Sequence, residues 1–228
     1  MLLTNQYRPN PDLSGNIQID GTVTGGILTR GVAEGGSVDI DSKGSITIAG
    51  LINASAIRVN GTFFGNGGDV RLISKGDIIL NPGAAIFSGG LLGGNITLKS
   101  DADISLIGPD PSPIITSVSF ADVPDVNGGN INVMARSLFL SDGALLDTRT
   151  SGAANAGNVT ITTTSAIELV GEDSSSSTSG VSSRLESGAT GNTGNVRVET
   201  PRYEEPRARA GIVFNYACAL LFLLFLLP

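Results

Sequence analysis

Apolar and polar residues alternate along most of this chain in short segments, and one five-residue phrase recurs. The phrase reads Gly-polar-aliphatic-polar-aliphatic, and its anchor glycines lie 21 to 37 residues apart. The seven copies occupy residues 15–19, 36–40, 68–72, 94–98, 129–133, 157–161 and 194–198. Alternation with period two predicts β-strands. Self-similarity at this spacing predicts a solenoid of stacked repeats.

Two further apolar segments follow most copies of the phrase. The first aliphatic residue of the second segment lies 10 positions after the anchor glycine in four units and 9 in a fifth. These second segments occupy residues 45–48, 77–80, 103–106, 137–140 and 166–169. The third segments are looser and occupy residues 50–52, 84–86, 114–115 and 143–146. Length varies mainly after the third segment, where the proline-rich stretch 108–113 and the serine run 174–177 predict loops.

Three short strands per repeat, with glycine at the corners, predict an all-β fold: a parallel β-helix of about six to seven coils over residues 15–200. Residues 1–14 are expected to form an irregular lead-in, and residues 201–228 a non-repeat tail with an apolar run at 212–227. We expect almost no helix. A β-sandwich with antiparallel hairpins is the competing fold.

The aliphatic residues of the first two segments are expected to stack inside, because neighbouring coils of a parallel sheet lie about 4.8 Å apart. In the first segment they are Ile17, Ile19, Val38, Ile40, Val70, Leu72, Ile96, Leu98, Ile131, Val133, Val159, Ile161, Val196 and Val198. In the second they are Ile46, Ile48, Ile78, Leu80, Ile104, Leu106, Leu138, Leu140, Ile167 and Leu169.

Composition narrows the chemistry that the 228 residues can perform. Hydrophobic residues make up 40% of the chain, which is not a disordered composition, and charged residues only 15%. The net charge of −7 would repel a phosphate backbone, so we predict no nucleic-acid partner. The chain has no histidine, and Cys218 is its one cysteine, so the sequence predicts no internal disulfide, no metal site and no cofactor.

The segment SLFLSDGALLDTRTSGAANAGNVTI, residues 137–161, resembles the repeats of filamentous haemagglutinin-like exoproteins, above all the large repeat proteins of this type in cyanobacteria. Residues 35–48 and 93–106 share the pattern, and the resemblance covers roughly residues 15–200. It implies a right-handed β-helix that an outer-membrane partner exports by two-partner secretion. It also implies an adhesin or surface filament that contacts cell-surface or extracellular glycans or proteins.

Two sets of polar residues are candidates for a site. The asparagine of the phrase recurs as Asn16, Asn95, Asn130, Asn158 and Asn195, where stacked amides can form hydrogen-bonded ladders or serve as turn residues. Asp77 and Asp103 occupy the same position in neighbouring coils, and two carboxylates about 5 Å apart would suit retaining glycoside hydrolysis. Aspartate is also common at turns, and both residues lie at the turn before the second segment. We therefore predict no catalytic residue.

Other polar patterns are interpreted as surface. Asp39 and Arg71 are expected to be neighbours on the first segment, and Lys43, Lys75, Asp101 and Arg136 to stack at the first corner. The stretch Gly65-Asn66-Gly67-Gly68-Asp69 resembles half of a calcium nonapeptide but has no tandem copies. Four glycosylation-type triplets, which begin at Asn53, Asn60, Asn95 and Asn158, are interpreted as incidental.

The two ends of the chain carry separate expectations. Residues 1–5 have neither the basic region nor the apolar region of a signal peptide. The apolar run 212–227 would span about 24 Å as a helix, against a hydrocarbon core of about 30 Å. Three interpretations of the tail remain open, namely an altered or truncated gene end, a membrane tail and a buried cap.

From the sequence we predict a structural or adhesive segment of a secreted or cell-surface protein. The alternatives are a polysaccharide-active β-helix enzyme and a nonfunctional truncated fragment.

Overall fold

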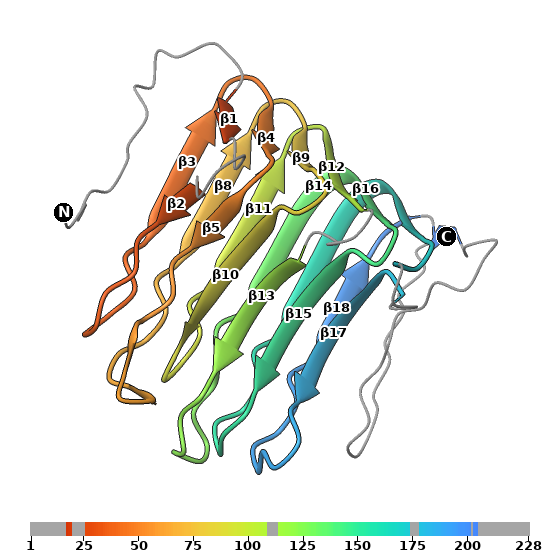
Figure 1. Ribbon diagram of the computed structural model, residues 1–228. Coiled ribbons are helices and arrows are strands. Elements are labelled where there is room, and N and C mark those ends of the chain that lie inside the picture. The colour runs from red at the N-terminus through yellow and green to blue at the C-terminus, as the bar shows by residue number, and fades with distance from the viewer. Residues whose placement is uncertain (1–16, 20–25, 109–113, 174–177, 202, 205–228) are drawn as a thin grey trace.

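The computed structural model describes all residues except 1–16, 20–25, 109–113, 174–177, 202 and 205–228. The described residues form a parallel β-solenoid with three faces and contain no helix (Figure 1). All pairings within the two large sheets are parallel, which rules out the β-sandwich. The predicted loop at 174–177, most of the loop at 108–113 and the apolar run at 212–227 lie outside the described residues.

The first face carries the recurring phrase. Its strands are β3 (Val38–Ser42), β8 (Val70–Ser74), β11 (Ile96–Ser100), β14 (Ile131–Ser141), β16 (Val159–Val170) and β18 (Val196–Glu199). Strands β14 and β16 continue around the corner, and a register irregularity between Ala135 and Ser137 marks the bend in β14. The second face therefore consists of the C-terminal halves of these two strands with β1 (Ile17–Ile19), β4 (Ile46–Ile48), β9 (Ile78–Leu80), β12 (Asp103–Ile107) and β19 (Tyr203–Glu204).

The third face is a sheet of six strands. They are β2 (Gly26–Leu28), β5 (Leu51–Asn53), β10 (Ala85–Gly90), β13 (Ile114–Ser119), β15 (Leu145–Thr150) and β17 (Gly180–Leu185). After β5, the chain makes a small antiparallel hairpin of β6 (Arg58–Val59) and β7 (Thr62–Phe63) outside the solenoid. Strands β2 and β17 were not expected from the sequence.

The core is a stack of aliphatic side chains in register from coil to coil. Ile96 aligns with Val70, and Leu98 aligns with Leu72, with all four side chains buried. Every inward residue predicted in β3 to β16 is buried, while Val196 and Val198 are partly buried against the core. Burying one such side chain contributes roughly 1.5–3 kcal/mol, so stacking is the main source of stability.

Two expectations about the coils are wrong. Ile17 and Ile19 do not belong to the first face, because β1 aligns with β4 and Ile17 pairs with Ile46 on the second face. The spacing is too short for a complete coil, because only 21 residues separate Gly15 from Gly36, fewer than between any later pair of anchors. The number of complete coils is also slightly lower than the six to seven expected. Within the described residues five segments cross all three faces, and each end adds a partial coil.

Candidate functional site: an asparagine corner

The corner between the third face and the first face of the next coil repeats one polar pattern. Five successive coils place a glycine followed by aspartate or asparagine there, and four of the five place another asparagine three residues earlier, in residues 66–69, 92–95, 127–130, 155–158 and 192–195. We call this edge the asparagine corner. A shallow groove of about 380 Å³ runs along it, lined by residues from three consecutive copies.

An inner ladder of side chains joins the coils at this corner. In each step a side-chain Oδ1 atom accepts the backbone N–H of the equivalent residue in the next coil. The order is Asp69, Asn95, Asn130, Asn158 and Asn195, with N···O distances of 2.7, 3.0, 2.8 and 2.8 Å. The side-chain amides of Asn95, Asn130 and Asn158 also donate to the preceding oxygen. The predicted ladder is thus confirmed for four asparagines, while Asn16 lies outside the described residues.

Turn conformation does not explain these asparagines. Among the described residues, the non-glycine positions with positive φ are Asn60, Asp125 and Asp142, so no ladder asparagine adopts the left-handed conformation. The amide is used for its hydrogen bonds, because each exposed corner N–H gains an acceptor in the adjacent coil.

A second, outer ladder runs three residues earlier and was missed in the sequence. Asn66 Oδ1 accepts the backbone N–H of Leu92 at 3.1 Å. Asn155 Nδ2 donates to Asn127 Oδ1 at 3.0 Å. Asn155 Oδ1 accepts one hydrogen bond from the backbone N–H of Asn192 and one from its side-chain amide. The signal was available, since four of the five copies carry an asparagine three residues before the inner position. Leu92 interrupts the outer ladder.

Glycine is required between the two ladders because backbones stack in direct contact there. A Cβ atom on Gly94, Gly129, Gly157 or Gly194 would lie 1.9 to 2.2 Å from the carbonyl oxygen of the equivalent glycine one coil earlier. Contacts this short cannot occur, so the recurrent glycine of the phrase reflects close approach of neighbouring coils.

Buried hydroxyl groups support the corner from inside. Ser88, Ser117, Thr148 and Ser183 occupy equivalent inward positions on the third face and are buried. Their hydroxyls donate to the carbonyl oxygens of Gly68, Gly94 and Gly157 at 2.6 to 2.9 Å. These bonds satisfy backbone acceptors that would otherwise be buried without a partner.

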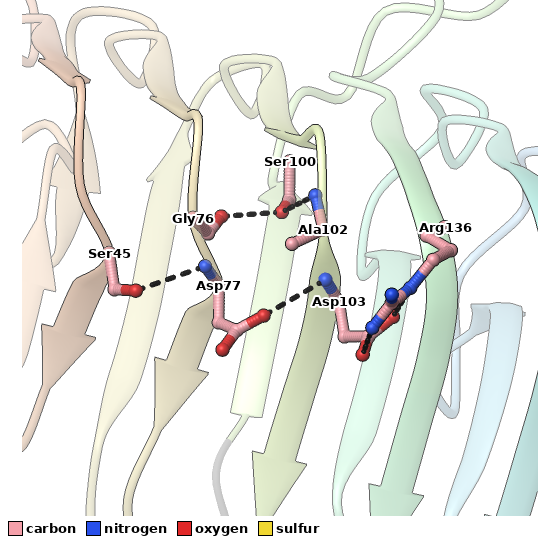
Figure 2. A network of polar contacts seen from close by, with 7 residues as sticks. All are labelled: Ser45, Gly76, Asp77, Ser100, Ala102, Asp103 and Arg136. Carbon is pink, nitrogen blue, oxygen red and sulfur yellow. Dashed lines mark hydrogen bonds and ion pairs between the residues drawn. The ribbon is translucent and has the colours of Figure 1, made fainter.

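Asp77 and Asp103 lie at a different corner, between the first and second faces (Figure 2). Asp77 Oδ1 accepts the backbone N–H of Asp103 at 3.1 Å, so it links coils as the ladder residues do. The Asp103 carboxylate is paired with the Arg136 guanidinium through two hydrogen bonds. Those bonds hold the pKa of Asp103 below its ordinary value of 3.8. A general acid at a glycosidic bond needs the opposite shift.

The predicted surface charge pairs are present in part. Arg71 Nη1 lies 2.7 Å from Asp39 Oδ1, as expected. At the corner between the first and second faces, Lys75 Nζ lies 2.6 Å from Asp101 Oδ2, as expected. Arg136 pairs with Asp103 and not with the other charged residues expected to stack there. Exposed pairs of this kind contribute about 0–1 kcal/mol each.

A buried carboxylate lies on the outer side of the third face. The Asp147 side chain is 1% exposed and accepts hydrogen bonds from Ser182 Oγ at 2.6 Å and Arg184 Nε at 3.1 Å. Arg149, the strand neighbour of Arg184, lies 3.8 Å away and also contacts Glu186. Burial raises the pKa of Asp147 above 3.8 despite these partners.

The raised pKa of Asp147 predicts that the stability of the native chain depends on pH in a way that the stability of the Asp147→Asn variant does not. The folded state binds the Asp147 proton more tightly than the unfolded state does. The contribution of Asp147 to the stability of the folded chain is therefore lost as pH rises from about 4 through the pKa of Asp147 in the folded state. We expect the free energy of unfolding of the native chain to fall with pH in this window relative to the variant, as measured by urea unfolding at a series of pH values. Parallel curves for the two chains would contradict the assignment.

Together these features define a class of protein: a parallel β-solenoid whose polar corner residues hold coils together. The described residues contain no group of acidic, cysteine or histidine side chains that could hold a metal ion. A search of the described residues for a helix long and apolar enough to cross a membrane found none. Comparison of the chain with family models, curated proteins and solved structures gave no match in any of the three.

Proposed function

We propose that this chain is a structural and adhesive segment of a secreted or cell-surface protein of the filamentous haemagglutinin-like type. The observation that carries the proposal is the use of polar side chains along the asparagine corner. Asn95, Asn130 and Asn158 each use the side-chain oxygen to bind the next coil. A residue used in this way holds the stack of coils together.

The outward positions of the first face support the same proposal. The central outward residue of the phrase is Asp39, Arg71, Thr97, Asn132, Thr160 or Arg197 in successive coils. Because the core positions repeat and the outward positions do not, the fold serves as a constant support for a variable surface. A surface of this kind suits contact with extended partners such as extracellular glycans or surface proteins.

The competing enzyme function rests on Asp77 and Asp103. In that case the purified chain would cleave acidic or neutral polysaccharides, and Asp77→Asn with Asp103→Asn would abolish the cleavage. The pairing of Asp103 with Arg136 favours the structural proposal, because the hydrogen bonds to Arg136 occupy both oxygens of the Asp103 carboxylate. If both variants lost polysaccharide cleavage while their free energies of unfolding stayed unchanged, the structural proposal would be wrong.

The cellular location of the chain tests the proposal directly. We expect antibodies against the chain to detect it in the culture medium or on intact cells of its source, and external protease to remove it from intact cells. A cytoplasmic protein should serve as the control that protease leaves untouched. Recovery of the chain only in the protease-protected soluble fraction would contradict a secreted or surface function.

A further inference from the structure

The β6–β7 hairpin carries an exposed Asn-Gly pair at its tip. Asn60 and Gly61 have φ values of 50° and 82°, and Val59 pairs with Thr62, which defines a two-residue type I′ turn. Both tip residues are exposed, and a Cβ atom added to Gly61 would meet nothing within 4 Å. The turn is therefore free of packing on its outer side.

The hairpin is held to the solenoid by a small aromatic cluster. The Phe63 and Phe120 rings stack with centroids 4.7 Å apart. The Arg58 guanidinium carbon lies 4.6 Å from the centroid of each ring. Since Arg58 and Phe63 are paired across the hairpin, the shape of the Asn60-Gly61 turn sets the geometry of this cluster.

The chain contains two other Asn-Gly pairs, and both lie in the asparagine corner. The Gly67 N–H donates to the Leu92 carbonyl at 2.8 Å, and the Gly128 N–H donates to the Asn155 carbonyl at 2.9 Å. Asn66 and Asn127 also accept hydrogen bonds in the outer ladder. In the part of the chain that the structure describes, neither the Gly61 N–H nor the Asn60 side chain makes such a bond.

We propose that Asn60 is a selective site of spontaneous deamidation. The Gly61 backbone nitrogen attacks Asn60 Cγ and loses its proton, while the Cγ–Nδ2 bond breaks and the side-chain nitrogen leaves as ammonia. Water then opens the resulting cyclic imide. Cleavage between the Gly61 nitrogen and Cγ leaves aspartate, and cleavage between that nitrogen and the main-chain carbonyl carbon leaves isoaspartate.

The reaction changes both the charge and the length of the turn. A carboxylate replaces a neutral amide, and isoaspartate adds a methylene to the backbone. A two-residue type I′ turn requires a fixed loop length. Isoaspartate therefore disrupts the pairing of Arg58 with Phe63 and releases Phe63 from Phe120. Asn60 is thus a site at which slow chemistry loosens a surface element without touching the core.

Peptide mapping of the full chain tests the proposal. After incubation at mildly alkaline pH, trypsin cleavage at Arg58 and Arg71 places Asn60 and Asn66 in one peptide, residues 59–71, where fragment masses distinguish them. We expect Asn60 to deamidate at least about tenfold faster than Asn66 or Asn127, because each of those must first break a backbone hydrogen bond. Amide exchange over residues 57–64 should quicken in the aged sample.

The chain unfolded in urea is the matched control, and there all three Asn-Gly pairs should react at similar rates. Similar rates in the folded chain would overturn the proposal, as would an unmodified Asn60 in a folded sample whose unfolded control has reacted. Unchanged exchange over residues 57–64 after conversion to isoaspartate would overturn the effect on the hairpin.

Discussion

Gly94→Ala is expected to destabilise the solenoid by about 3 kcal/mol or more. The new Cβ atom would lie 2.2 Å from the Gly68 carbonyl oxygen and 2.6 Å from Ser88 Oγ. Neither neighbour can withdraw freely, because Ser88 Oγ donates to Gly68 O at 2.7 Å and accepts from the Gly94 N–H at 2.9 Å. The change would therefore separate two coils at the asparagine corner. Urea unfolding measures the loss.

Gly89→Ala is the matched control, because it adds the same methyl group in the preceding strand. There the nearest atom to the new Cβ is Ser55 Oγ at 3.5 Å, an ordinary contact. We expect the free energy of unfolding to change by less than about 1 kcal/mol. Equal losses for Gly89→Ala and Gly94→Ala would contradict close backbone stacking at the corner.

Leu98→Ala is expected to cost about 2–5 kcal/mol. Leu98 is fully buried and aligns with Leu72 in one neighbouring coil and Val133 in the other, so its removal leaves a cavity between three coils. The adjacent Thr97 points outward, and Thr97→Ala should change stability by no more than about 0.5 kcal/mol. Thermal unfolding of the two variants measures this difference. A greater loss for Thr97→Ala would mean that the strand faces the other way.

The alternation of apolar residues was sufficient to predict the strands of the first two faces from β3 to β16, because each of these strands places alternate aliphatic side chains in the core. It failed where burial is achieved by other means. Strand β2 contains only Gly26, Ile27 and Leu28, and β17 begins with Gly180 and includes Ser182 and Ser183. Small and hydroxylated residues are typical of loops, yet Ser183 is buried because its hydroxyl is bonded to a backbone carbonyl.

The candidate site was predictable to a similar degree. The inner ladder coincides with the recurring phrase, so Asn95, Asn130 and Asn158 could be recognised. The outer ladder lies in a segment interrupted by Leu92 and reads as turn composition. Asp147 could not be recognised, because the alternation places it outward and only contacts with Ser182 and Arg184 make it buried. Such burial depends on neighbouring coils and leaves no periodic signal.

The central claim is that side-chain ladders at the asparagine corner couple adjacent coils. A double-mutant cycle of Asn130→Ala and Asn158→Ala tests it most directly, because Asn158 Nδ2 donates to Asn130 Oδ1 at 3.1 Å and the two changes remove both partners of this bond. Unfolding free energies should show a coupling of about 1 kcal/mol. The cycle of Asn95→Ala with Asn195→Ala, which share no ladder contact, should be additive within about 0.5 kcal/mol. Additive effects for Asn130 and Asn158 would contradict the claim.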